Sequence, residues 1–376
     1  MSLTSHTEFP AMIRLLFLAQ LPPPVHGASL MSRYLLDDLL KAPNYQVVPM
    51  SISTANSLSG LGKPTAGKLL RLFWLVLQLF TCLLRKRFDV AYITLTPTGP
   101  AFIKDSLLLA LAKLFVPRRV IHLHGKGIQA ELSRSALHRW AYRFVFSGCE
   151  VVHLSHCLLR DIEGLPCTAR HIVANGVPAQ PPISPTQKKY DFIYLSNLIE
   201  SKGIFDFLEA LGQLKAHRVP FRAAVVGSAA TEHVTNRVTE LLNKHQLHSD
   251  VDFLGPRYGE EKYSVLAASR IFVLPTLKDC FPLSILEAMS VGLPVVSTDE
   301  GAIAEIVEHK KSGLIVERGS PSSLSYALLQ LLRDPEQVLS MSIIAKERFE
   351  RNYSLDAFCF AMQQLLSQTV SSSTAG

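Results

Sequence analysis

Residues 270–298, RIFVLPTLKDCFPLSILEAMSVGLPVVST, contain an apolar run, a polar loop, an apolar helical segment and a second apolar run. The first run ends at Pro275, which is typical of a buried strand in a parallel sheet. Pro282 suits the first position of the helix, where a missing N–H is harmless. The stretch therefore predicts a strand–helix–strand unit, with Asp279 in the loop after the first strand and Glu287 on the helix.

The same alternation of short apolar runs and longer amphipathic segments continues along the chain, and it predicts parallel sheets with helical crossovers. The expected strands lie at 12–19, 45–50, 88–95, 118–125, 150–155, 190–197, 221–228, 251–256, 270–276, 294–298 and 313–317. A Pro-rich segment, 179–189, separates the two halves. We predict an α/β protein with two doubly wound Rossmann-like domains, 1–178 and 190–353, whose ligand site lies in the cleft between them.

The composition excludes several classes of protein. A chain of 376 residues, 48% hydrophobic and 18% charged, is long enough for two packed domains and is not disordered. It has no GxGxxG or GxxxxGK[ST] motif, which argues against an NAD-type dehydrogenase and a P-loop NTPase. Its six cysteines include no CxxC pair, so we expect no zinc site and a reducing compartment. The run from Ile13 is too short for a signal peptide, which favours a strand and a cytoplasmic location.

The net charge of +7 is unevenly distributed. Residues 1–180 contain 19 Lys+Arg and 9 Asp+Glu, whereas residues 181–376 contain 19 and 22. The basic half, with Arg85-Lys86-Arg87 and Arg118-Arg119, suits an anionic membrane surface or a lipid-linked phosphate, and a merely solvated basic face is the alternative. No basic recognition helix or aromatic-basic motif is present, so we expect no nucleic-acid partner.

The apolar stretch 69–84 has to be tested as a possible membrane span. Arg71 and Gln78 interrupt it, and it is shorter than the ~20 residues that a membrane span needs. We interpret it as a buried helix of the first domain, and a helix that also touches the membrane surface is the alternative.

The two carboxylates of the opening stretch suit a particular class of ligand. A carboxylate has two acceptor oxygens, which match the two hydroxyls of a vicinal diol. The N–H groups near Phe281, Leu283 and Ser284 lie at a helix N-terminus, which suits a phosphate. Together they favour a nucleotide sugar, while a capping Asp279 and a surface Glu287 are the structural alternative.

Several segments resemble one known family, the retaining GT-B glycosyltransferases of family 4. The stretch from Asp279 to Val296 resembles the E-x7-E region of that family, and SNLIESKG at 196–203 its phosphate-binding loop. Further similar segments are PPPVHGASLMSRYLL (22–36), HLHG (122–125), NGVP (175–178) and VDFLGP (251–256). The combination is most similar to bacterial envelope and exopolysaccharide enzymes.

The resemblance implies a GT-B fold, whose last helix, 354–370, crosses back to the N-terminal domain. It also implies a role for each matching residue. Glu287 would bind the ribose and Asp279 the donor sugar, while Lys202 would bind the diphosphate. Gly27 would let its loop approach the diphosphate, and His124 would lie beside the sugar. The donor-binding set is Gly27, Asn197, Lys202, Asp279, Phe281, Pro282, Leu283, Ser284 and Glu287, and the catalytic set is His124, Lys202, Asp279 and Glu287.

Two positions depart from the family pattern. Asp279 is one methylene shorter than the usual Glu, and Asn197 stands where the family commonly has Arg. Losing that guanidinium removes a bidentate phosphate contact. Structural alternatives exist for three other residues. Lys202 could be a surface lysine, Gly27 a turn residue, and His124 a histidine at a strand end.

The implied function is a retaining, metal-independent transfer of a sugar from a nucleotide-diphosphate sugar, with no cofactor. The acceptor would be lipid-linked or a polysaccharide, at the inner face of the cytoplasmic membrane. The alternatives are a non-catalytic nucleotide-sugar-binding protein and a nucleotide-sugar epimerase with the same fold. The sequence leaves open the donor's base and sugar, the acceptor and the linkage.

Overall fold

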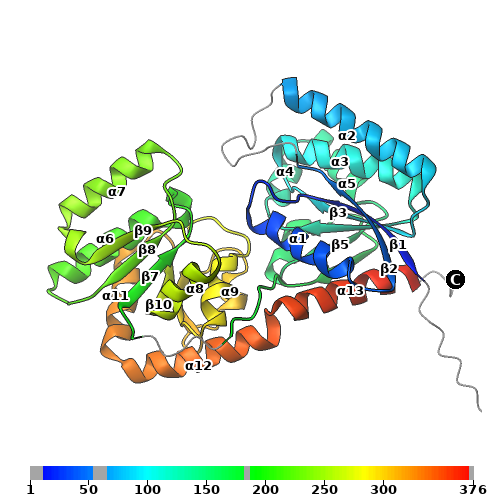
Figure 1. Cartoon of the computed structure of the whole chain (residues 1–376). Coiled ribbons are helices and arrows are strands. Elements are labelled where there is room, and N and C mark those ends of the chain that lie inside the picture. Colours follow the sequence, from blue (N-terminus) through cyan, green and yellow to red (C-terminus); the bar gives the residue numbers. More distant parts are fainter. Residues whose placement is uncertain (1–11, 54–65, 182–186, 372–376) are drawn as a thin grey trace, which may run out of the picture. The chain divides into compact units, whose positions relative to one another are not determined.

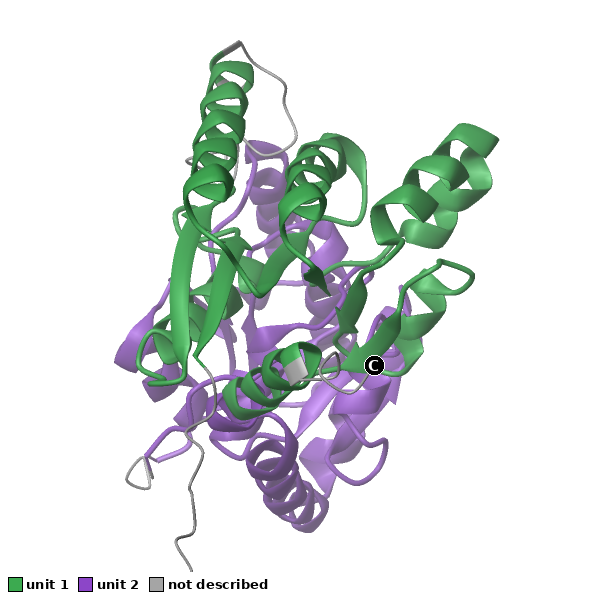
Figure 2. Cartoon of the chain, turned by 90° about the vertical axis from the view of Figure 1, so that its right-hand side faces the viewer, with its two compact units in different colours: residues 1–173, 359–376 green, residues 174–358 purple. Residues whose placement is uncertain are grey.

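The chain forms two compact units, coloured separately in Figure 2. The computed structural model describes residues 12–53, 66–181 and 187–371. Unit 1 comprises Met1–Val173 and Cys359–Gly376, and unit 2 comprises Ala174–Phe358. The expected hinge, 179–189, lies partly outside the described residues.

Unit 1 is built on a six-stranded parallel sheet with the strand order β2-β1-β3-β4-β5-β6 (Figure 1). Its strands are β1 (Ile13–Ala19), β2 (Tyr45–Ser51), β3 (Val90–Leu95), β4 (Arg118–Leu123), β5 (Glu150–His153) and β6 (Ala169–Ile172). The sequence did not predict β6, because ARHI is short, half polar and only partly buried.

Six α-helices of the described chain pack in unit 1 or end in it. They are α1 (Gly27–Leu39), α2 (Ala66–Arg85), α3 (Gly99–Phe115), α4 (Ile128–Arg134), α5 (Ala136–Phe146), and α13 (Leu355–Ser371), with the 3₁₀ helix η2 (Cys157–Ile162) between β5 and β6. One face of the sheet packs against α2, α3 and α5 in a single apolar core. From Cys359 on, α13 belongs to unit 1. There Gln363 bonds Asp38 at 2.7 Å, and Thr369 bonds Glu150 at 3.0 Å.

Unit 2 also contains a six-stranded parallel sheet, with the order β12-β11-β10-β7-β8-β9. Its strands are β7 (Tyr190–Leu195), β8 (Ala223–Val226), β9 (Val251–Gly255), β10 (Ser269–Leu274), β11 (Val295–Thr298) and β12 (Gly313–Val316). If β7 to β12 are numbered 1 to 6 within the unit, the sheet read from β9 has the strand order 3-2-1-4-5-6. This is the strand order of a doubly wound Rossmann sheet.

The connections of unit 2 are helical, as the alternating sequence pattern predicts. They are η3 (Glu200–Lys202), α6 (Ile204–Ala216), α7 (Glu232–Lys244), η4 (Leu247–Ser249), α8 (Gly259–Ala267), α9 (Leu283–Ser290) and α10 (Ile303–Ile306), and α11 (Pro321–Arg333) and α12 (Pro335–Asn352) follow β12. Figure 1 shows α6, α7, α8, α9, α11 and α12 around the sheet of the unit.

Helix α2 corrects one expectation from the sequence. The stretch 69–84 does form a helix, but it is not a buried one. Only Leu75, Leu79 and Leu83 are buried, and they pack into the core below the helix. Spacing of i, i+4 and i+8 places these three side chains on one face, and the partly buried Val76 and Cys82 also pack against the core. The exposed large apolar side chains of the helix lie on its other face. Among the described residues, no helix is both long and apolar enough to span a membrane.

Two histidines are fully buried in the sheet of unit 1. His122 on β4 shares a hydrogen bond of 2.8 Å with the hydroxyl of Tyr92, and His153 on β5 accepts one of 2.9 Å from the Leu154 N–H. Burial lowers the pKa of His122 well below its ordinary value, and nearby His124 and His153 lower it further. Burial also lowers the pKa of His153 from 6.5 to about 4.

We predict that the stability of the protein falls as the pH falls from 6.5 toward 4. In this window the unfolded chain binds a proton at His153 that the folded chain does not bind, so acid favours unfolding. His153→Asn keeps an acceptor for Leu154 and removes this titration. It should reduce the slope of unfolding free energy against pH by up to roughly 1.4 kcal/mol per pH unit, measured by urea unfolding. An unchanged slope would contradict this account.

Candidate active site

The sheet of unit 2 leaves its carboxyl edge open between two central strands. β7 and β10 are adjacent and parallel, with Ile193 paired to Phe272. The chain leaves β7 toward β8 and leaves β10 toward β11, which lie on opposite sides. Such a switch point is the usual ligand site of a doubly wound sheet, because no crossover covers it. Lys202, after β7, and Asp279, after β10, lie there.

The two loops at this switch point are joined by backbone contacts. The carbonyl of Ser201 accepts hydrogen bonds from Thr276 Oγ1 and the Leu277 N–H, both at 2.9 Å. Gly203 closes η3 with a φ of 75°, and a Cβ there would lie 1.9 Å from the carbonyl oxygen of Pro275. Only glycine allows this approach, which fixes Lys202 beside the loop that carries Asp279.

Lys202 and Asp279 form an ion pair. The Asp279 side chain also accepts a hydrogen bond of 2.8 Å from the Cys280 N–H. Both side chains are mostly buried, with 23% of Lys202 and 14% of Asp279 exposed. The structure therefore brings together two of the predicted site residues that are 77 positions apart in the sequence.

Two further charged residues support this loop, and the sequence analysis missed them. Glu300, which follows β11 and is buried, accepts a hydrogen bond of 3.2 Å from the Asp279 N–H. Arg318, after β12, pairs with Glu300 at 2.7 Å and with Asp299 at 2.8 Å. Since both follow predicted strands, the rule that sites gather at the carboxyl edge could have found them.

Glu287 lies on α9, where it is buried and bound by Lys262 of α8 at 2.6 Å. Burial raises the pKa of the Glu287 carboxyl, and the charge and hydrogen bond of Lys262 oppose that rise. Lys262 is a third residue that the sequence analysis missed. Its position on a polar helix gave no signal, because the contact depends on how α8 packs near α9.

The N-terminus of α9 begins one residue later than predicted. Pro282 is the N-cap and Leu283 the first helical residue. Phe281 is buried and makes an edge contact with Tyr353, with ring centroids 6.2 Å apart. Leu283 and Ser284 are partly exposed, and the first N–H groups of a helix have no partner within it. Asn197, in the turn after β7, is exposed.

Gly27 and His124 belong to unit 1. Gly27 is the first residue of α1 and is exposed, while the preceding residue, His26, caps the helix. His124 directly follows β4, and its ring lies 4.1 Å from that of His122. The residues that the structure describes include no group of three or more His, Cys, Asp or Glu side chains arranged to hold a metal ion.

Comparisons with known proteins agree with this architecture. Residues 177–348 match the family described as "Glycosyl transferases group 1". The putative colanic acid biosynthesis glycosyltransferase WcaL of Salmonella typhimurium is 28% identical over 61% of this chain and 55% of its own length. The amylovoran biosynthesis glycosyltransferase AmsK of Erwinia amylovora is 28% identical over 43% of this chain and 40% of its own length. The chain thus spans about half the length of the curated relatives that it matches.

Solved structures share the fold across nearly the whole chain. A glycosyltransferase from Rickettsia africae has a TM-score of 0.77 at 16% identity and covers 96% of this chain and 100% of its own. Anabaena Alr3699/HepE in complex with UDP-glucose has a TM-score of 0.71 at 19% identity, over 95% of this chain and 100% of its own. Two Rossmann-like units with these neighbours define the GT-B fold. Within unit 2, residues 177–348 are thus similar to the group 1 glycosyltransferases.

We predict that Gly203→Ala destabilises the protein more than Gly255→Ala. Both glycines have a positive φ, of 75° and 67°, but a Cβ on Gly255 would meet nothing within 4 Å. The control variant, Gly255→Ala, should lose about 1–2 kcal/mol of unfolding free energy, because alanine is strained in the left-handed backbone conformation. Gly203→Ala should lose a further ~1–3 kcal/mol, because Pro275 must move. Equal losses in urea unfolding would show that the close approach to Pro275 is unimportant.

We also predict that Lys262→Met destabilises the protein by about 3 kcal/mol at pH 7, because it leaves Glu287 buried and unpaired. Without the lysine the folded-state pKa of Glu287 rises further above its unfolded value, so the deficit should shrink as the pH falls toward 5. The double variant Lys262→Met/Glu287→Gln should recover much of the loss. If the double variant is no more stable than the single one, the pair does not act as described.

Proposed function

We propose that the protein transfers a sugar from a nucleotide-diphosphate sugar to a lipid-linked or polysaccharide acceptor. The observation that carries the proposal is the placement of Lys202 and Asp279 at the switch point of one sheet, with Glu287 on the helix that follows. This edge is where doubly wound sheets bind nucleotides. Its charges suit a ligand with a diphosphate and two sets of hydroxyls.

Each candidate site residue of unit 2 has a chemical task in this proposal. Lys202 binds the diphosphate, and the first amides of α9, at Leu283 and Ser284, assist it. Asp279 accepts hydrogen bonds from the hydroxyls of the donor sugar, and Glu287 accepts them from the ribose. The roles expected for Gly27 and His124 of unit 1, toward the diphosphate and the sugar, stay predictions from the family resemblance.

The proposed transfer retains the configuration of the sugar and needs no metal. The bond between the anomeric carbon and the phosphate oxygen breaks, and a bond from the acceptor oxygen forms on the same face of the sugar. The acceptor proton goes to the departing phosphate, so no side chain is needed as the base. Lys202 and the helix amides stabilise the negative charge that develops on the phosphate, which is the task a metal ion has in other transferases.

We further propose that the acceptor is an intermediate in exopolysaccharide synthesis at the cytoplasmic face of the membrane. Two curated relatives are described as acting in colanic acid and amylovoran biosynthesis. The structural neighbour HepE was solved with UDP and with UDP-glucose, which supports a nucleotide sugar as donor. The alternative, a protein that binds a nucleotide sugar without turnover, is favoured by Asn197, where the family commonly has a cation.

We predict that one of UDP, GDP and ADP stabilises the protein selectively against heat. A ligand present at 100 times its dissociation constant stabilises by about 2.7 kcal/mol, which a thermal shift assay detects. Glu287→Gln keeps the shape of the side chain but replaces one acceptor oxygen with a donor, so it should abolish most of this stabilisation. Glu240→Gln is the control, because Glu240 is exposed on α7 and pairs only with Arg237 among the described residues.

Two results would decide against the proposal. If none of the three nucleotides stabilises the protein, the proposed donor site is wrong. If Glu287→Gln is stabilised as fully as the unmodified chain, Glu287 does not bind the nucleotide as proposed. Stabilisation without release of free nucleotide from any nucleotide sugar, with crude membranes as the source of acceptor, would favour the non-catalytic alternative.

A further inference from the structure

The outward face of α2 is apolar, although it is exposed. Seven of its large apolar side chains are 39–67% exposed. At about 100° per residue, all seven lie within an arc of about 140°, and the buried Leu75, Leu79 and Leu83 lie outside it. The exposed set includes Leu69, Leu70, Phe73, Trp74, Phe80 and Leu84. A helix that is apolar on both faces is normally covered on both.

Two neighbouring helices extend this surface. α2 packs beside α3, and α3 beside α5 (Figure 1). Phe80 of α2 meets Phe115 of α3 with ring centroids 6.1 Å apart, and on α5 the exposed Trp140 stacks on Phe144 at 5.8 Å. Of the 23 exposed large apolar side chains among the described residues, 14 lie on these three helices and only five in unit 2. We call the outward surface of α2, α3 and α5 the apolar face.

The charges around the apolar face have one sign. α2 and α5 contain no acidic residue, and the single acid of α3, Asp105, is buried and paired with Lys104. Arg85, Lys86 and Arg87 are exposed at the end of α2, with no ion pair to another described residue. α5 adds two exposed arginines, at positions 139 and 143. The surroundings of the face are therefore basic.

We propose that the apolar face docks on an anionic lipid bilayer. Its apolar side chains enter the boundary between headgroups and acyl chains, where tryptophan and phenylalanine are favoured, and Arg85-Lys86-Arg87 binds lipid phosphates. A second copy of this chain complements the face less well. A two-fold dimer would set the cations of one copy near those of the other, with no accessible carboxylate on the three helices to pair with them.

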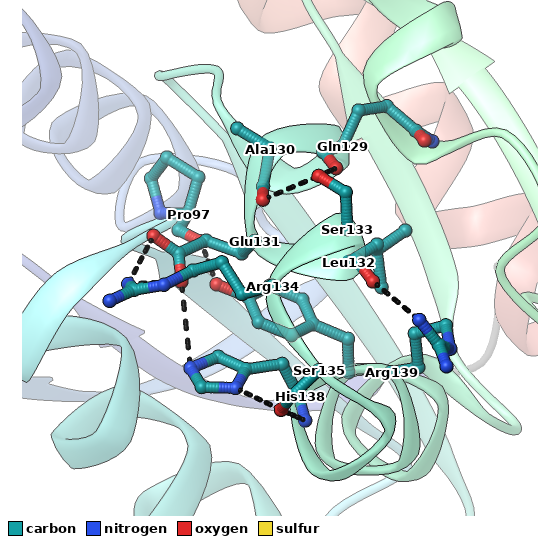
Figure 3. A network of polar contacts seen from close by, with 11 residues as sticks. Pro97, Gln129, Ala130, Glu131, Leu132, Ser133, Arg134, Ser135, His138 and Arg139 are labelled. Atoms are coloured by element: carbon teal, nitrogen blue, oxygen red, sulfur yellow. Dashed lines mark hydrogen bonds and ion pairs between the residues drawn. The ribbon is translucent and has the colours of Figure 1, made fainter.

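A cavity beside the apolar face fits the same occupant. It has a volume of about 380 Å³ and lies between α3, α4 and α5, with Phe102, Ile103, Leu137 and Tyr142 in its wall. Polar residues line the other side of the cavity. Figure 3 shows their contacts, in which Glu131 pairs with Arg134 at 2.9 Å and lies 3.8 Å from His138. Its one carboxylate is thus neutralised. Exposed Ile103 and Leu137 belong to both the cavity wall and the face, so a lipid chain could enter it from the membrane.

This inference deepens the proposed function, because it names the membrane at which a lipid-linked acceptor would be met, but its test needs no transfer. We would measure co-sedimentation with vesicles of phosphatidylcholine alone and of phosphatidylcholine with an equal amount of phosphatidylglycerol. At low salt the intact chain should bind the anionic vesicles at least ten-fold more tightly. Phe73→Ser/Trp74→Ser should weaken this binding ten-fold or more, and Arg85→Gln/Lys86→Gln/Arg87→Gln should remove the preference for anionic vesicles.

Leu339→Ser/Ile343→Ser is the matched control, since it removes two exposed apolar side chains from α12 in unit 2. It should bind vesicles as the unmodified chain does, and circular dichroism should show all variants folded. Failure of the unmodified chain to bind either vesicle would overturn the proposal, as would an equal loss in the control. A dimer in sedimentation equilibrium that Phe73→Ser/Trp74→Ser dissociates, without vesicle binding, would assign the face to a second copy. If the chain binds vesicles but no nucleotide stabilises it, the proposed donor site is wrong and the membrane-docking proposal stands.

Discussion

The switch point between β7 and β10 is the constraint on which the candidate site depends. Because the crossovers on its two sides run in opposite directions, the carboxyl edge of the sheet stays open there. The carbonyl of Ser201 then joins the two loops, and Gly203 lets them approach to a distance that no Cβ would allow. The positions of Lys202 and Asp279 follow from this backbone arrangement, and the position of Glu300 follows from its bond to the same loop.

The charges at this edge are balanced in pairs. Lys202 pairs with Asp279, Lys262 with Glu287, and Arg318 with Glu300, so that no carboxylate of these three is buried without a cation. Buried pairs contribute little net stability, but they hold both side chains in one geometry. In the proposed complex the diphosphate would attract Lys202. The hydroxyls of the donor sugar would then replace part of the contact that Asp279 makes with Lys202. Donor binding would then exchange polar partners within a site that is already formed.

Much of this could be predicted from the sequence, and the reason differs for each part. Strands such as β7 and β10 have continuous apolar runs, so the loops that hold Lys202 and Asp279 could be placed at a sheet edge. The pairing of Glu287 with Lys262 could not, because it depends on how two helices pack. The exposed face of α2 could not either, since an apolar helix does not reveal which of its sides is covered. Short, half-polar β6 gave too weak a pattern.

Hydrogen–deuterium exchange with and without UDP, GDP or ADP would test the central claim most directly. We expect one nucleotide to slow amide exchange in two segments of unit 2, residues 196–203 and 279–287, which the Ser201 contacts join into one edge. Protection of these two segments together would place the nucleotide at the switch point. Protection elsewhere in unit 2, with both segments unchanged, would contradict the account.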